Sequence, residues 1–510
     1  MNQRSDVALE SPGVVAEHHR EQMVAGMRWT LWLSVFLAPC GYITTVLLAR
    51  IGPQVVGTYG ILTLYIGLTS VFLFFGGNGV AIKFVPELPQ DKRLSFLLSY
   101  CLVILAATLP YQIAASIWPG GLKYVFGKEV NDWFGLLLIW VAPIAIFSSL
   151  ALAALKGLLE IKWSQVYNRV ITLGTFVLYV ALYFGDRSLL AAQYKTIIWS
   201  TFGFLTLIVT ALATRRLLRH IPWPRDQKSL RFLLPPGFWP YTWGLQASSV
   251  LNFLSARLDY IFILNAGGLV EFGKYVTLIT LTSVIPTFAT FVLDSLLPSL
   301  THTLALRDYS TARRITEVYL RFMLPCGLIA ATFAILFVHP LFKILGPRYI
   351  DLVSLGLIAF PIATLQVLNW FVGTMFTAIG MPHRDAMVKA VRTVIFCAAF
   401  WSFWPQFHLQ GAIWAWGIGE ISYQLLGIYF LLRKMPFKFS FIPTYAAYLA
   451  AVCLSAVSSE LLGDHRPVAT LLTWVALVGG FFLGAGYTWS EIRRLLRLVL
   501  PSRAGTSMPI

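Results

Sequence analysis

The sequence predicts an all-α integral membrane protein with about 14 transmembrane helices. We expect two six-helix bundles that are parallel repeats of each other, followed by two further helices at the C-terminal end. Three observations lead to this prediction. The composition is too apolar for a water-soluble domain, apolar stretches of bilayer-spanning length recur along nearly the whole chain, and short motifs repeat at a nearly constant offset.

The composition places the chain in lipid. Apolar residues make up 57% of the 510 residues, charged residues only 12%, and the mean hydropathy is +0.72. A soluble domain carries roughly 25% charged residues. The net charge of +17 would suggest nucleic acid in a soluble protein. Here the basic residues lie in short connections between apolar stretches, so we exclude nucleic acid as a partner and expect the bilayer instead.

Apolar stretches divide the chain into elements and connections. A membrane-spanning helix needs about 20 mostly apolar residues. We expect such helices at approximately 28–50, 57–80, 94–118, 133–155, 168–184, 196–214, 239–264, 270–298, 317–338, 350–379, 390–404, 411–432, 443–461 and 468–489. The predicted organisation is a tail (1–27), a first bundle (28–214), a basic linker (215–238), a second bundle (239–432), two extra helices (433–490) and a basic tail (491–510).

The distribution of Lys and Arg predicts the orientation. With the N-terminus placed inside the cell, these residues are roughly threefold more numerous in the inside segments than in the outside ones. Both termini are therefore expected in the cytoplasm. Residues 1–27 have no apolar core of the kind found in a cleaved signal peptide and are expected to form a cytoplasmic tail. Arg257 is the one basic residue that this assignment leaves well inside a span.

Internal repeats predict the relation between the two bundles. Gly57 near the start of the second span corresponds to Gly273 near the start of the eighth, and Pro143 in the fourth span corresponds to Pro361 in the tenth. Both pairs lie about 218 residues apart, which is six spans. Because six is an even number, the two halves have the same orientation in the membrane. The five cysteines all lie in apolar spans and are expected to be small core residues.

Several motifs in this arrangement resemble those of a known transporter family. The first half carries Leu47–Pro53 (LLARIGP), Gly57–Gly60 (GTYG), Gly76–Gly79 (GGNG) and Lys83–Pro86 (KFVP), and the second half carries Arg257–Asp259 (RLD), Phe272–Tyr275 (FGKY), Leu297–Pro298 (LP) and Leu345–Tyr349 (LGPRY). Over about residues 28–440 the chain resembles the polysaccharide-transporter (Wzx-like) flippases of lipid-linked oligosaccharides. These belong to the MOP superfamily, with the MATE exporters and the lipid II flippases.

The resemblance implies a function and a location. It implies a flippase that moves a polyprenyl-pyrophosphate-linked oligosaccharide across the bacterial inner membrane by alternating access, for exopolysaccharide, O-antigen or capsule export. Other polysaccharide assembly proteins are then possible partners. Fourteen spans also occur in lipid II flippases. However, Trp29–Arg50 lacks the acidic and arginine-rich pattern expected in their first span.

Ionisable and polar residues inside the spans are the candidate substrate-binding groups, because they are costly unless they face protein or water. In the seventh span Asn252 and Asp259 lie on one helical stripe with Ser248 and Ser255, while Arg257 lies on a neighbouring stripe. We favour the stripe with Asn252 as the face that lines a cavity. The alternative for Arg257 and Asp259 is that they snorkel to the membrane surface or cap the helix.

Further candidates lie near the ends of spans. Arg50 and Lys274 are placed at the outer mouth, where cations attract phosphate. Asn78 lies in the glycine-rich segment at the inner end of the second span. Lys83 and Asp294 occupy loosely repeat-related positions and are candidates for a gate ion pair. For all four charged residues the alternative is a helix end that meets lipid headgroups.

No motif for an enzyme, a metal centre or a nucleotide site is present. The sequence has no HExxH, Walker A or GxSxG pattern in a suitable context. We therefore expect no catalytic residue, no metal and no cofactor, and a driving force from a coupling proton or sodium ion, the substrate gradient or a partner. A membrane glycosyltransferase, ligase or polymerase is disfavoured because the outside connections are short.

A MATE-type exporter of small organic cations is the main alternative from within the same fold. It predicts a carboxylate near the middle of the bilayer. The acidic residues considered for this role, Asp259 and Asp294, both lie toward the ends of their spans, which disfavours the exporter.

Overall fold

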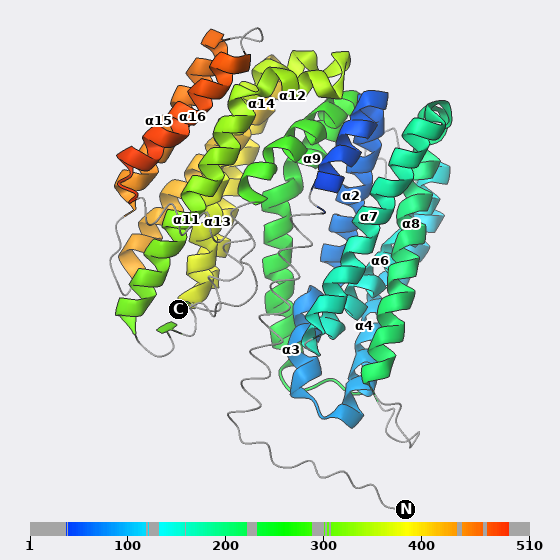
Figure 1. The fold of residues 1–510 in the computed structure, drawn as a ribbon. Helices are drawn as coiled ribbons and strands as arrows, with labels where there is room; N and C mark the ends of the chain where they lie inside the picture. The colour runs from blue at the N-terminus through cyan, green and yellow to red at the C-terminus, as the bar shows by residue number, and fades with distance from the viewer. Residues whose placement is uncertain are drawn as a thin grey trace, which may run out of the picture. The chain divides into compact units, whose positions relative to one another are not determined.

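The computed structural model describes residues 37, 39–118, 121, 132–158, 160–221, 232–287, 300, 303–304, 308–435, 441–462 and 467–488. In these residues the chain forms two compact units, Met1–Gly273 and Lys274–Ile510. The secondary structure of the described residues is entirely helical (Figure 1). The bundle boundaries at 214 and 239 rest on the sequence repeat and stay a prediction.

The first unit begins with a short apolar helix at Pro39–Ile51. It continues with α2 (Pro53–Leu73), α3 (Gly77–Glu87), α4 (Gln90–Ile117), α6 (Asp132–Gly157), α7 (Ile161–Gly185), α8 (Arg187–His220) and most of α9 (Phe238–Thr282). The second unit contains the end of α9, α11 (Tyr309–Leu336), α12 (Val338–Leu345), the 3₁₀ helix η3 (Pro347–Leu352), α13 (Val353–Ala378), α14 (Pro382–Lys434), α15 (Ile442–Leu462) and α16 (Pro467–Gly484).

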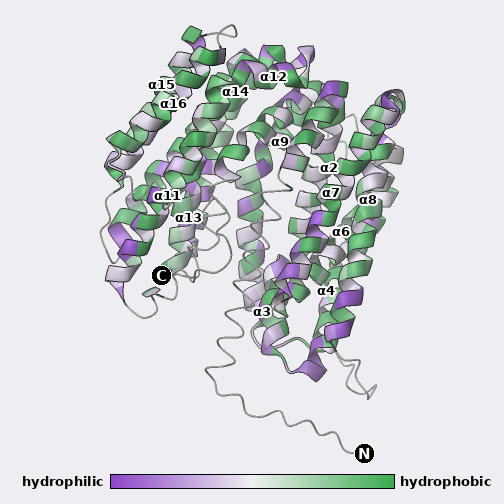
Figure 2. Ribbon diagram, viewed as in Figure 1, coloured by the Kyte–Doolittle hydropathy of each residue, from purple (hydrophilic) through white to green (hydrophobic). Residues whose placement is uncertain are grey.

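The predicted fold class is confirmed. Of the described helices, 11 are long and apolar enough to cross a membrane, and apolar residues cover most of their length (Figure 2). Two of these helices each contain two predicted spans. Helix α9 has a non-helical residue at Gly268, and α14 has one at His408. The eleventh predicted span, placed at 390–404, therefore belongs to a helical segment that begins much earlier, at Pro382.

A break in the second predicted span separates α2 from α3. Gly76 and Gly77 have φ angles of 72° and 61°, a left-handed conformation that glycine adopts without steric cost. The backbone groups freed by the break are hydrogen-bonded by two side chains. Gln246 of α9 accepts from the Gly76 amide at 3.0 Å and donates to the Val71 carbonyl at 2.5 Å, and Tyr100 of α4 donates to the Phe75 carbonyl at 2.5 Å. The break is therefore a fixed feature that anchors the start of α9.

Two repeat-related glycines bring α2 and α9 into backbone contact. A Cβ atom on Gly273 would lie 1.9 Å from the carbonyl oxygen of Pro53, and one on Gly57 would lie 2.6 Å from that of Leu269. Contacts this short exclude any side chain at either position. The repeat motif thus marks a close helix crossing inside the first unit.

The two C-terminal helices are part of the second unit's core. Helix α15 packs against α11 and α13, and α16 packs against α11 and α15. The fully buried Tyr448 of α15 donates a hydrogen bond to the Thr364 carbonyl of α13 at 3.2 Å. Ser459 donates to the Ile335 carbonyl of α11 at 2.9 Å. These buried polar contacts fix α15 to the helices that precede it.

Candidate functional site

A carboxylate lies buried near the middle of the membrane-spanning part of α14. Glu420 is only 2% exposed. At 1.5 Å per residue it lies about 18 Å along the helix from the kink at His408 and about 21 Å from the helix end at Lys434. An ionisable group at this depth is costly unless partners compensate for the lost hydration.

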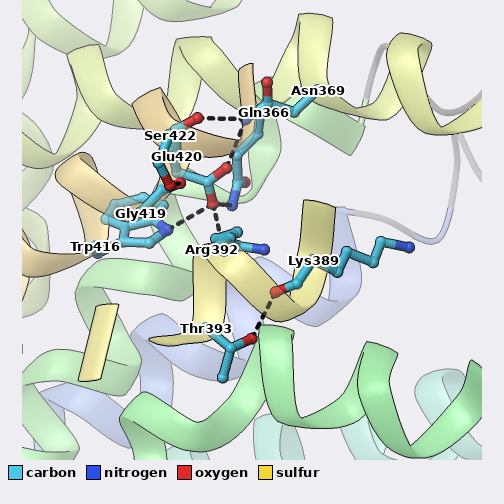
Figure 3. Close-up of polar contacts among 9 residues, drawn as sticks. All are labelled: Gln366, Asn369, Lys389, Arg392, Thr393, Trp416, Gly419, Glu420 and Ser422. Carbon is cyan, nitrogen blue, oxygen red and sulfur yellow. Dashed lines mark hydrogen bonds and ion pairs between the residues drawn. The ribbon is translucent and has the colours of Figure 1, made fainter. Parts of the chain in front are cut away.

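Four side chains donate hydrogen bonds to the Glu420 carboxylate (Figure 3). Arg392 lies 2.6 Å away through Nη2, and the indole Nε1 of Trp416 and the amide of Gln366 each donate to Oε1 at 2.9 Å. The amide of Asn369 donates to Oε2 at 2.7 Å. Gln366 and Asn369 come from α13 and the others from α14. One guanidinium and three neutral donors therefore replace the water that this carboxylate would have in solution.

A second ion pair lies beside the first. Asp385 and Lys389, in the first segment of α14, are 2.8 Å apart, and Tyr423 from the second segment donates to Asp385 at 2.5 Å. We call the two pairs and their partners the polar seam. It consists of Gln366, Asn369, Asp385, Lys389, Arg392, Trp416, Glu420 and Tyr423.

The polar seam combines zero formal net charge with one unsatisfied acceptor. Its two carboxylates are matched by one ammonium and one guanidinium group. Among the described residues, the side-chain oxygen of Asn369 is buried without a hydrogen-bond partner. A proton or a water next to Glu420 would find an acceptor in that oxygen. Within the described part of the chain, no cluster of His, Cys, Asp and Glu is suited to a metal ion.

The seventh predicted span, the first part of α9, carries Asn252 and Asp259 on its more open side and Arg257 on the neighbouring stripe. Asn252 is exposed, and Arg257 and Asp259 are half-buried. The Arg257 guanidinium lies 4.6 Å from the ring centre of Tyr260, and Asp259 accepts from the Tyr260 amide at 2.9 Å. On the neighbouring stripe Gln246 is buried. The stripe with Asn252 is thus the more accessible of the two.

The remaining candidates occupy several separate places. Asn78 is exposed at the start of α3, and the Lys83 ammonium lies 4.1 Å from the ring centre of Tyr241. Arg50 is exposed at the end of its helix, where its carbonyl accepts from Arg187 at 2.8 Å.

The outer candidate in the second unit already has a carboxylate partner. Lys274 forms an ion pair with Asp351 of η3, so a phosphate would have to compete with that carboxylate. Asp294 lies outside the described residues, and its pairing with Lys83 stays a prediction.

The polar seam was missed in the sequence, and two signals could have revealed it. Glu420 lies inside the predicted span 411–432 and needed only to be counted among the intramembrane carboxylates. Arg392 lies near the start of the predicted span 390–404, whereas the structure places it ten residues after Pro382, inside the longer helix α14. Arg392 therefore joins Arg257 as a basic residue in the interior of a long helix.

Comparisons with known sequences give no family. No protein-family model matches the chain, and no curated protein sequence matches it.

Comparisons with solved structures identify the fold. A lipid II flippase in an inward-closed conformation matches with a TM-score of 0.67 and 13% identity, over 92% of this chain and 99% of that one. An inward-facing MATE multidrug transporter of the MOP superfamily matches with a TM-score of 0.62 and 12% identity, over 79% and 97%. An outward-facing MATE multidrug transporter of the same superfamily matches with a TM-score of 0.57 and 14% identity, over 81% and 94%. The chain is thus a multi-pass membrane protein with the fold shared by MATE transporters and the lipid II flippase.

Proposed function

We propose that this protein is a flippase that moves a polyprenyl-pyrophosphate-linked oligosaccharide across the bacterial inner membrane. It works by alternating access, with both termini in the cytoplasm, and supplies glycan for exopolysaccharide, O-antigen or capsule export. The motifs in both halves of the chain support the glycan substrate. The match to a lipid II flippase extends over more of this chain than the match to MATE transporters, which supports the flippase activity.

The observation that carries the proposal is the polar stripe of α9. Asn252 lies about 21 Å from the start of the helix, well inside the membrane, and is nevertheless exposed. An exposed amide at this depth is tolerated when it faces water or a polar substrate. Asn252 and Asp259 offer hydrogen-bonding groups for sugar hydroxyls, and the Arg257 guanidinium offers the planar donor set that suits a phosphate.

The experiment is complementation of a deletion strain. Cells that lack the protein should accumulate undecaprenyl-pyrophosphate-linked sugar in the cytoplasmic leaflet. Wild type should clear this intermediate, whereas Arg257→Ala and Asp259→Ala should not, at equal expression. Asn265→Ala, an exposed residue of the same helix off the stripe, is the matched control and should rescue. Normal export in the deletion strain would exclude the glycan substrate.

Glu420 supports a second candidate, an ion-coupled exporter of small organic cations. That function predicts a carboxylate near the middle of the bilayer, and Glu420 occupies such a position. Its ion pair with Arg392 sets Glu420 apart from a carboxylate that is available to bind a cation. The exporter is therefore the weaker of the two candidate functions.

The exporter is tested in a host without drug pumps. It would lower the accumulation of a cationic dye such as ethidium, and Glu420→Gln would abolish the effect. If wild-type protein leaves dye accumulation and drug sensitivity unchanged, this candidate is excluded.

A further inference from the structure

A cavity of about 360 Å³ lies in the second unit where α11, α15 and α16 meet. Its lining residues are Arg313, Glu317, Leu320, Arg321, Leu324, Phe441, Pro443, Thr444 and Ala485. This volume lies in the range of small-molecule binding pockets, which is about 300–1,000 Å³. The cavity contains none of the residues of the polar seam or of the α9 stripe, so it is a separate site.

The helix ends place this cavity at a membrane boundary. Arg321 is the last charged residue of α11 before an uncharged apolar run that begins at Phe322. Thr444, in the first turn of α15, and Ala485, just after the end of α16, line the same cavity as Arg321 and so lie at a similar depth. Phosphate headgroups lie at this boundary in a bilayer. Ile442 and Leu483, at the ends of α15 and α16, are 65% and 83% exposed, as expected for residues that contact acyl chains.

The cavity lining combines basic and acidic side chains. Among the described residues, it contains Arg313, Arg321 and Glu317. Arg313 pairs with Glu317 at 2.9 Å. Tyr487 donates to the Arg321 carbonyl at 2.7 Å and so holds the chain after α16 against α11.

The arginine-bearing turn of α11 is held by a capping carboxylate at its start. Asp308 accepts from the Thr311 amide at 3.0 Å, and hydrogen bonds from Thr311 and Ser310 lower the pKa of this carboxyl to about 2. The cap fixes the first turn of α11, which carries Arg313.

We propose that this cavity binds the phosphodiester headgroup of an anionic phospholipid. Arg321 contacts the phosphate, Arg313 contributes when the anion draws it from Glu317, and the Thr444 hydroxyl offers a further donor. The lipid would join α11 to the two C-terminal helices at one face of the membrane.

The test is lipid binding by full-length protein in detergent. The protein is titrated with phosphatidylglycerol and with phosphatidylcholine of the same acyl chains, and bound lipid is counted by native mass spectrometry. A basic residue near an anionic lipid contributes about 1 kcal/mol, or roughly fivefold in affinity. Phosphatidylglycerol should therefore bind several-fold more tightly. Arg313→Gln/Arg321→Gln should remove this preference, whereas Arg314→Gln, on the same turn but outside the lining, should keep it.

Two further measurements keep the result interpretable. Arg321→Lys preserves the charge and should keep most of the preference, which separates loss of binding from loss of folding. Equal retention of the two lipids by wild type would overturn the proposal, as would an equal loss in Arg314→Gln. Displacement of phosphatidylglycerol by millimolar inorganic phosphate alone would show a free-anion site and would also overturn it.

Discussion

At the scale of single residues, the Glu420–Arg392 ion pair needs an explanation, because a charged pair inside an apolar helix bundle is energetically costly. Taking both charges out of water costs several kcal/mol per ion, and well-packed apolar side chains at such positions are often equally stable. The Glu420 carboxylate nevertheless accepts from two amides of α13 and from an indole on the preceding turn of α14. Such a concentration of donors on one carboxylate is typical of functional groups inside membranes.

Glu420→Gln is expected to destabilise the protein. The substitution removes the buried carboxylate that pairs with the partly buried Arg392 guanidinium, and breaking one side of a buried pair costs about 3–5 kcal/mol. Thermal unfolding of purified protein in detergent should show a lower apparent Tm. Glu460→Gln, at an exposed carboxylate near the end of α15, is the control.

The double variant Glu420→Gln/Arg392→Gln should recover part of the lost stability, because neither charge is then unpaired. A Glu420→Gln protein as stable as wild type would show that the pair is not energetically coupled.

At the scale of elements, the glycine crossing of α2 and α9 is the most constrained contact in the first unit. At both glycines the nearest atom to a new Cβ is a backbone carbonyl oxygen, which cannot move aside by changing rotamer. The crossing therefore sets the distance between the two helices, and the break at Gly76–Gly77 with its Gln246 contacts holds the other end of α9.

Gly273→Ala is expected to force α2 and α9 apart. Overpacking of this kind commonly costs about 1–3 kcal/mol, and more when only backbone can yield. The yield of monodisperse protein in size-exclusion chromatography should fall. Gly244→Ala, in the same helix with nothing within 4 Å of the new Cβ, should leave the yield unchanged or raise it. A Gly273→Ala protein that behaves like the control would contradict so close a crossing.

Elements were easier to predict than sites. Apolar runs predict the helices, because a membrane-spanning helix depends on local composition. The repeated motif predicts the equivalence of Gly57 and Gly273. The segment from Pro382 to Lys389 carries His383, Arg384 and Asp385, so its hydropathy resembles a loop. Asp385 of this stretch accepts a hydrogen bond from Tyr423 in the second segment of α14, and such a tertiary contact is invisible in one sequence.

At the scale of the whole molecule, the side of the membrane on which each proposed site lies depends on the orientation of the chain. This orientation is predicted from the distribution of the basic residues. The cavity at α11, α15 and α16 lies at the cytoplasmic face under this orientation, because α11 begins and α16 ends there.

Reporter fusions test the orientation. Alkaline phosphatase joined after Gly346 or His408 should be active, because both positions are expected outside, and inactive after Gly380 or Lys434. Green fluorescent protein should give the reverse pattern, since it fluoresces when it folds in the cytoplasm. The same activity at His408 and Lys434 would contradict the assignment of two spans to α14.

The kink at His408 has a consequence for biogenesis. The two segments of α14 run back along each other, since Asp385 meets Tyr423, Arg392 meets Glu420 and Phe407 meets Trp414. Each segment alone would present a charge that the insertion machinery accepts poorly, at about 2.5–3.5 kcal/mol near the centre of a helix. As a hairpin, the two segments can leave the translocon together with their charges already neutralised. Loss of Arg392 or Glu420 would then reduce the amount of protein inserted in the membrane, independently of any effect on transport.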